Sequence, residues 1–261
     1  MSGAHEPIAG RFVWYDLMAT DPAAALAFYG GLFGWTSRPV LAGAPGRQIV
    51  FRSGDRDVAG VVPLASADDG AASRWVSYAG VGELETALAR VAPAGGQVSG
   101  PAADFPSFGR FAPIADPLGA GLSLLEGAGP SPTRDDAAGP GHFCWNELLT
   151  ADPKVAAAFY RDVLGWTTTE RDLGAFGRYW IFWRGDRDVA GMVASPAGVA
   201  SRSLWLPYVQ VASAEDTAAL AVELGGAVVM PPADLPGRGR SAMISDPAGG
   251  MVAVFELIVA A

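Results

Sequence analysis

The sequence predicts an α+β protein of four βαβββ units, arranged as two tandem halves. The first observation is a repeat, because the heptad GDRDVAG occurs at Gly54–Gly60 and again at Gly185–Gly191. The second is that extended runs and helical patterns follow each other in the same order in both halves. The third is that Gly, Asp and Pro mark the segment ends at matching places. A repeat of this length indicates a duplicated domain.

The repeat divides the chain of 261 residues into a first half, 1–126, and a second half, 142–261. The stretch between them, 127–141, reads GAGPSPTRDDAAGPG and has the composition of a linker. Matching residues lie 131 positions apart early in the repeat and 130 apart from Trp205 onwards. We therefore expect two domains joined by a short connection.

The first unit of each half begins with a strand and continues with a helix. Asp21-Pro22 is typical of a helix start, since Asp caps the first turn and Pro fits it. Gly34 predicts the end of this helix. In the first half the expected elements are Phe12–Ala19, the helix from Asp21 to Gly34, and two strands joined by the turn Gly54–Asp57, at Gln48–Ser53 and Val58–Pro63.

The second unit repeats this order. Trp75–Val81 is predicted to be a strand and Glu83–Ala94 a helix that ends at Gly95-Gly96. Three short strands follow, and the turn Asp116–Gly119 joins the last two. The second half carries the same signals, so the whole chain contains four such units.

Composition excludes several classes of function. The net charge of -9 argues against a nucleic-acid partner, because phosphate binding needs clustered basic residues. Cys144 is the single cysteine and has no internal partner, which favours a reducing, cytoplasmic setting. We expect no signal peptide and no membrane span, since the chain has neither a charged-then-apolar start nor an apolar run of about 18 residues.

Three paired motifs carry a family resemblance. Phe28-Tyr29 with Gly34-Trp35 matches Phe159-Tyr160 with Gly165-Trp166, and both halves have a DPxG turn before the last strand. This pattern resembles the vicinal oxygen chelate superfamily over Arg11–Leu257, and within it a two-domain actinobacterial subgroup described as glyoxalase-like or hydroxylase. The superfamily includes glyoxalase I, extradiol dioxygenases and bleomycin-resistance-type antibiotic-binding proteins. The resemblance implies two tandem domains of the glyoxalase/bleomycin-resistance type, with open, cup-shaped sheets around a ligand cavity.

The resemblance also implies where a divalent metal ion is held in the superfamily's enzymes. His or Gln on one first strand, His on the next unit's first strand and Glu on the last strand are the usual ligands, and such donors suit Zn, Ni, Fe or Mn. At these positions the chain has Trp14, Val76 and Ser123 in the first half, and Trp145, Leu206 and Ala253 in the second. We therefore expect no metal site and no cofactor.

The remaining donors do not replace these ligands. His5 lies near the N-terminus, and His142 is three residues before Trp145, so it faces the other side of its strand. Glu126 and Glu256 are three residues past the last-strand position and also face away, as strand-end carboxylates on the surface. No Ser-His-Asp or Cys-His set can be assembled from this sequence.

Strand alternation predicts which side chains line the two cups. The expected ligand-binding residues include a Trp/Tyr pair in each half, Trp14 with Tyr78 and Trp145 with Tyr208. An acid follows each tryptophan by two residues, Asp16 and Glu147. The full predicted sets are Phe12, Trp14, Asp16, Val76, Tyr78 and Ser123 in the first half, and Phe143, Trp145, Glu147, Leu206, Tyr208 and Ala253 in the second.

Two hypotheses about function follow. One is metal-free binding of a hydrophobic aromatic molecule, such as an antibiotic or secondary metabolite, for sequestration, resistance or delivery to a pathway enzyme. The other is a glyoxalase-like lyase or isomerase, or a tailoring enzyme, with Asp16 or Glu147 as general base and Tyr78 or Tyr208 as hydrogen-bond donor. A structural alternative is that Trp14 and Trp145 only fill the cups, and the halves can differ in this. We expect a small-molecule partner and either a monomer with a dimer-like arrangement of domains or a homodimer.

Overall fold

The computed structural model describes residues 8–39, 49–64, 72–105, 108–127, 139–174, 177–195, 203–235 and 237–258. Of the linker expected at 127–141, residues 128–138 lie outside these ranges, as does His5. No helix of the described residues is long and apolar enough to cross a membrane.

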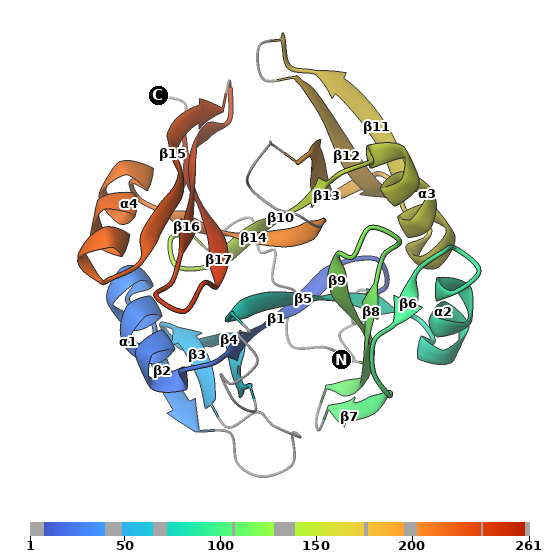
Figure 1. Cartoon of the computed structure of the whole chain (residues 1–261), viewed down its shortest axis with the longest axis horizontal. Coiled ribbons are helices and arrows are strands. Elements are labelled where there is room, and N and C mark those ends of the chain that lie inside the picture. Colours follow the sequence, from blue (N-terminus) through green and yellow to red (C-terminus); the bar gives the residue numbers. More distant parts are fainter. Residues whose placement is uncertain are drawn as a thin grey trace, which may run out of the picture. The chain divides into compact units, whose positions relative to one another are not determined.

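The order of elements confirms the four βαβββ units (Figure 1). In the first half they are β1 Phe12–Ala19, α1 Pro22–Phe33, β2 Thr36–Pro39, β3 Ile49–Ser53, β4 Arg56–Pro63, β5 Arg74–Val81, α2 Leu84–Val91, β6 Gln97–Val98, β7 Ala103–Phe105, β8 Gly109–Ala115 and β9 Gly121–Glu126. In the second half they are β10 Phe143–Thr150, α3 Pro153–Leu164, β11 Thr167–Asp172, β12 Arg178–Arg184, β13 Arg187–Ala194, β14 Leu204–Val211, α4 Ala214–Glu223, β15 Ala227–Leu235, β16 Gly239–Ser245 and β17 Met251–Leu257. The sequence did not predict β2 as a separate strand, and β6 and β7 together occupy the place of the single strand β15.

The helix ends follow the predicted signals. Asp21 accepts a hydrogen bond from the backbone N–H of Ala24 at 3.0 Å, and Asp152 does the same for the start of α3. Gly34 and Gly165 end α1 and α3 with φ of 68° and 69°, in the left-handed region that favours glycine. These local signals therefore set the position of both helices.

The chain packs as two compact units, and each unit takes segments from both halves. Unit 1 consists of Met1–Trp14, Ser77–Pro132 and Trp145–Trp205, and unit 2 consists of Tyr15–Val76, Thr133–Cys144 and Leu206–Ala261. Unit 1 holds the strand order β5-β9-β8-β6, with β7 beside β8, and the order β11-β12-β13-β10. Unit 2 holds β2-β3-β4-β1 and β14-β17-β16-β15. These open sheets confirm the α+β class.

Each unit has its own hydrophobic core beneath its helices. Helices α2 and α3 contact each other in unit 1, and α1 contacts α4 in unit 2 (Figure 1). Phe159, Trp166 and Phe182 are fully buried members of the unit 1 core. Trp35 is buried in the unit 2 core and Trp166 in the unit 1 core, and their indole N–H groups donate to the carbonyl oxygens of Gly141 and Gly10 at 2.7 and 3.0 Å.

A buried hydrogen-bond chain joins the two halves inside unit 1. The Trp205 indole N–H donates to the Tyr160 hydroxyl at 2.8 Å, and this hydroxyl donates to Asp116 Oδ2 at 3.1 Å. The other oxygen of Asp116 accepts from the backbone N–H groups of Leu118 and Ala120. Burial raises the pKa of Asp116 above its ordinary value, although these hydrogen bonds oppose the rise. Tyr160 belongs to the second half and Asp116 to the first.

Unit 2 contains the equivalent series of hydrogen bonds, in which the Trp and Tyr come from the first half and the Asp from the second. Trp75 donates to the Tyr29 hydroxyl at 2.9 Å, and Tyr29 donates to Asp246 Oδ2 at 3.0 Å. The Tyr of the FY motif in one half therefore bonds the Asp of the DPxG turn in the other. We call each of these sets a Trp–Tyr–Asp chain.

The two glutamates expected on the surface are helix caps instead. Glu126 accepts a hydrogen bond from the backbone N–H of Leu84 at 2.8 Å, and Glu256 accepts one from Ala214 at 2.9 Å. Leu84 and Ala214 begin α2 and α4, where backbone N–H groups lack helical partners and the helix dipole favours negative charge. Their position beside a helix start could not be read from the strand pattern.

The stability of the protein is expected to fall in alkali. Burial, followed by the nearby carboxylates, holds the pKa of Tyr29 and of Tyr160 well above the ordinary value. In the unfolded chain both tyrosines lose their protons near pH 10, so stability falls as pH rises above about 10, by up to about 1.4 kcal/mol per pH unit for each tyrosine. Denaturant unfolding between pH 8 and 11 measures this slope. The double variant Tyr29→Phe/Tyr160→Phe should have a flatter slope, and an unchanged slope would contradict the assignment.

Candidate functional site

In unit 1 the sheet of the second half has a face turned away from α3, on which Leu149, Ile181 and Gly191 are buried. Leu148, Phe182 and Met192 point into the core on the side of α3, so the alternate residues of β10, β12 and β13 face the other way. Strand pairing places these residues in two rows. One row is Glu147, Gly191, Ile181 and Thr169, and the next is Leu149, Val193, Tyr179 and Arg171. We call this surface, together with Trp145, the second-half face.

An aromatic pair lies on the second-half face. The Trp145 indole N–H donates to the Tyr179 hydroxyl at 3.1 Å, and both side chains are half-buried. Gly191 lies below them: a Cβ there would be 2.9 Å from Trp145 Nε1 and would overlap the Tyr179 hydroxyl. The last glycine of the repeated heptad therefore makes room for this pair. Glu147, also half-buried, is the direct strand neighbour of Gly191.

The corresponding residues of the first half are more deeply buried. Trp14 is 2% exposed and stacks on Phe108, with 6.0 Å between ring centroids. Tyr78 is 4% exposed and contacts Phe111 edge-on at 5.6 Å. Ser123, the strand neighbour of Tyr78, is also buried. All five residues belong to unit 1.

Other predicted site residues lie in unit 2. Asp16 is 1% exposed and Val76 is half-buried. Leu206, Tyr208 and Ala253 are buried, and the last two are neighbours on β14 and β17. The carbonyl oxygen of Tyr208 also accepts from the Cys144 thiol at 3.6 Å.

The prediction was wrong for Phe12 and Phe143. Phe12 packs in the unit 1 core against Trp205, at 5.2 Å between ring centroids, and Phe143 stacks on Tyr15 at 3.8 Å in the unit 2 core. The prediction assumed one core and one cup per half. Strands β1 and β10 instead each begin in one unit and end in the other. The first residue of each strand therefore packs into the hydrophobic core of the unit in which the strand begins.

The residues at the superfamily's ligand positions do not fit a divalent metal ion. Apart from the hydroxyl of Ser123, these positions hold indole, alkyl and methyl side chains. In the described ranges, no three or more His, Cys, Asp or Glu residues are grouped so that they could hold a metal ion. His142 is half-buried, with Nδ1 3.3 Å from the carbonyl oxygen of Pro140.

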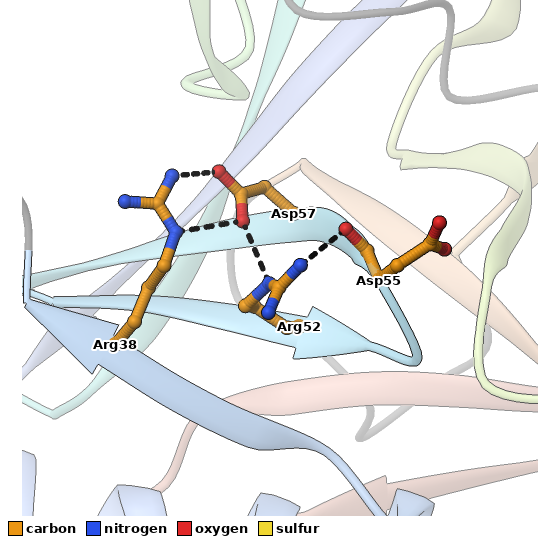
Figure 2. A network of polar contacts seen from close by, with 4 residues as sticks. All are labelled: Arg38, Arg52, Asp55 and Asp57. Atoms are coloured by element: carbon orange, nitrogen blue, oxygen red, sulfur yellow. Dashed lines mark hydrogen bonds and ion pairs between the residues drawn. The ribbon is translucent and has the colours of Figure 1, made fainter.

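The first half has a row of strand neighbours equivalent to the row from Glu147 to Thr169, and the two rows differ in charge at the end that Thr169 occupies. In the first half this row is Asp16, Gly60, Val50 and Arg38. Figure 2 shows Arg38 and Arg52 both bound to Asp57, with Arg52 also donating to the carbonyl oxygen of Asp55. These residues lie around the first GDRD turn, which joins β3 and β4 as expected and is exposed at Gly54, Asp55 and Arg56.

At the equivalent place the second half keeps Asp188, the counterpart of Asp57, but has no arginine at the two matching positions. Thr169 and Trp183 occupy the positions of Arg38 and Arg52, and the Trp183 indole N–H donates to Thr169 Oγ1 at 2.8 Å. The duplicated framework therefore carries two arginines in one copy and a threonine and a tryptophan in the other.

The sequence-based site set missed Tyr179. The signal was available in β12, where the aromatic run Tyr179-Trp180-Ile181-Phe182 matches Gln48-Ile49-Val50-Phe51 in the first half. An aromatic residue present in only one copy of a repeat indicates a surface that is specific to that copy.

Comparison with known proteins agrees with this architecture. The model of the Glyoxalase/Bleomycin resistance protein/Dioxygenase superfamily matches residues 11–124, and that of the Glyoxalase-like domain matches 143–255. A protein of Mycobacterium tuberculosis named as a glyoxylase, CFP32, is 36% identical over 93% of both chains. Anthracycline biosynthesis protein DnrV of Streptomyces peucetius is 34% identical over 95% of this chain and 94% of its own.

Solved structures share the fold at low identity. The Mn(II)-bound glyoxalase from Novosphingobium aromaticivorans gives a TM-score of 0.65 at 16% identity, over 95% of this chain and 82% of that one. The 2,3-dioxygenase LapB from Pseudomonas sp. KL28 gives 0.61 at 15% identity, over 95% and 92%.

Proposed function

Because this chain belongs to the glyoxalase/bleomycin resistance protein/dioxygenase superfamily, we propose that it binds a planar, hydrophobic aromatic small molecule without a metal ion. The binding surface in this proposal is the second-half face. The observation that carries the proposal is the half-buried Trp145–Tyr179 pair above Gly191. By the sequence resemblance, Trp145 occupies the first-strand position at which the superfamily's enzymes hold a metal-binding side chain.

Aromatic contact alone supplies enough free energy for useful affinity. A well-placed ring pair contributes about 0.5–1.5 kcal/mol beyond the burial of its area. A ligand of about 30 heavy atoms, at about -0.3 kcal/mol per atom, reaches about -9 kcal/mol, which is a sub-micromolar Kd. Glu147 can accept a hydrogen bond from an amine or hydroxyl of such a ligand and so fix its orientation.

The relatives suggest a class of ligand. DnrV and its Streptomyces sp. relative DauV are named anthracycline biosynthesis proteins, and an anthracycline contains a flat system of fused rings. We therefore propose an aromatic secondary metabolite of this shape as the ligand, held for sequestration, resistance or delivery to a pathway enzyme. The buried first-half residues Trp14, Asp16 and Tyr78 fill their own part of the fold and leave binding to the second half.

The test is a titration of intrinsic tryptophan fluorescence with a soluble hydroxyanthraquinone, on protein whose metal content has been measured. We expect saturable quenching with a sub-micromolar Kd that is unchanged by a strong chelator. Stoichiometric Zn, Ni, Fe or Mn in active protein would overturn the metal-free binding mode. The absence of quenching across a broad set of aromatic natural products would overturn the binding function.

A tailoring or isomerase activity is the second candidate, and the accessibility of Glu147 favours it. Glu147 is half-buried on the same face as Trp145, whereas its counterpart Asp16 is 1% exposed. In this scheme the Glu147 carboxylate removes a proton from the bound substrate as general base.

Glu147→Gln separates the two candidates. If Glu147 is the base, this variant should lose turnover by about 100-fold or more while its ligand Kd changes by about threefold or less. Asp16→Asn is the matched control and should leave turnover unaffected. Turnover that persists in Glu147→Gln would contradict the assignment of the base, and the binding function would stand without it.

A further inference from the structure

A concave site lies in unit 1, on the side of the helices. It is a groove of about 500 Å³ between the start of α2 and the end of α3. A volume of this size is typical of sites for small molecules. Its apolar lining includes Val81, Ala87, Val163 and Leu164, all of which are buried. The second-half face and this groove share no residue, so the inference is independent of the proposed function.

Two arginines line this groove. Arg90 lies in the last turn of α2, and Arg184 ends β12. The Arg184 stem is held against the backbone, because a Cβ on Gly10 would be only 2.8 Å from its Cγ and Cδ. One guanidinium nitrogen of Arg184 lies 3.4 Å from the carbonyl oxygen of Gly165. Both cations are therefore carried by fixed elements on the rim of the groove.

Neither arginine has an ion-pair partner among the described residues. At least six of the twelve other described arginines do, in a chain whose net charge is -9. The paired ones include Arg38, Arg52, Arg110, Arg161, Arg178 and Arg240. Glu83 also lines the groove, and its carboxylate accepts a hydrogen bond from the Thr86 hydroxyl at 3.3 Å. Two unpaired guanidinium groups against one engaged carboxylate leave the groove selective for an anion.

The duplication supplies an internal comparison. At the matching positions of unit 2, Leu220 replaces Arg90, Ser53 replaces Arg184 and Phe33 replaces Leu164. Phe33 packs against Trp35, with ring centroids 4.8 Å apart. Both cations are thus specific to the unit 1 copy, although the framework around them is the same.

We propose that this groove binds a small organic anion, a carboxylate on a compact apolar body. The guanidinium groups of Arg90 and Arg184 hold the carboxylate, and the body rests on Val81, Ala87 and Leu164. The planar donor fork of arginine matches a carboxylate better than a lysine would.

The test uses benzoate, hexanoate and inorganic phosphate as separate probes, followed by NMR of the backbone amides. We expect saturable shifts at Gly80, Gly82 and Gly165 with benzoate or hexanoate, and weaker binding of phosphate because it has no apolar body. Arg90→Gln and Arg184→Gln should each weaken the binding at least about tenfold. Arg238→Gln is the control, since Arg238 is exposed in unit 2.

Three results would overturn the proposal. The first is the absence of saturable shifts at these glycines, and the second is an equal loss of binding in Arg238→Gln, which would show a general charge effect. The third is phosphate binding as tight as that of the carboxylates, which would show that the apolar part of the ligand contributes nothing to binding. Trp145→Ala should leave benzoate binding unchanged, so this test and that of the aromatic ligand succeed or fail separately.

Discussion

Replacing Tyr160 with phenylalanine is expected to lower the free energy of unfolding by about 2–5 kcal/mol. The hydroxyl accepts from the Trp205 indole and donates to Asp116 inside the unit 1 core. Its removal leaves an indole N–H and a carboxylate oxygen buried without this partner, at about 1–3 kcal/mol each and more for a charged group. Urea unfolding at pH 7, monitored by far-UV circular dichroism, measures the change.

Two matched variants test this explanation. Tyr29→Phe breaks the equivalent chain between Trp75 and Asp246, and it should cost a similar amount. Tyr179→Phe removes a hydroxyl that is half-buried, and it should cost about 1 kcal/mol or less. If all three variants were equally stable, the buried chains would not be the source of the effect.

Replacing Trp145 with alanine is expected to weaken binding of the aromatic ligand by about 30-fold or more. A central aromatic residue at a binding surface commonly contributes about 2 kcal/mol or more, and here the indole is the largest accessible ring beside Glu147. Equilibrium titration with the hydroxyanthraquinone, followed through ligand fluorescence, gives the ratio of Kd values.

Trp14→Phe is the control for this prediction. Trp14 is buried against Phe108, so the smaller ring should leave the Kd within about twofold of the parent value. Trp145→Phe keeps a stacking surface and loses only the hydrogen bond to Tyr179, and we expect a loss of about tenfold or less. An equal loss in Trp14→Phe and Trp145→Ala would contradict the assignment of the ligand to the second-half face.

The parts of the fold that depend on local signals could be predicted from the sequence. Asp21 and Asp152 cap their helices, and Gly34 and Gly165 end them, because capping and left-handed backbone geometry involve only adjacent residues. The repeat then extended each local assignment to a second place in the chain. This is why the α+β class and the four βαβββ units follow from composition and spacing alone.

Contacts between distant segments could not be predicted in this way. Tyr29 and Asp246 are 217 positions apart, and no periodicity links them. The prediction for Phe12 and Phe143 failed for the same reason, since each half was treated as closing on itself. The repeat makes Trp14 and Trp145 equivalent in sequence, but the deep burial of Trp14 depends on neighbours such as Phe108, which lies in the turn before β8.

The crossed Trp–Tyr–Asp chains affect how the two copies can diverge. A substitution at Asp116 removes a hydrogen-bond partner of Tyr160, which lies in the other copy. A buried substitution in one copy therefore requires a compensating substitution in the other. In the part of the chain that the structure describes, exposed positions such as Arg38 and Thr169 bond only within their own copy, and at these positions the sequences of the two copies differ. The buried residues of the two copies are therefore constrained together, whereas the surface residues of each copy can change independently.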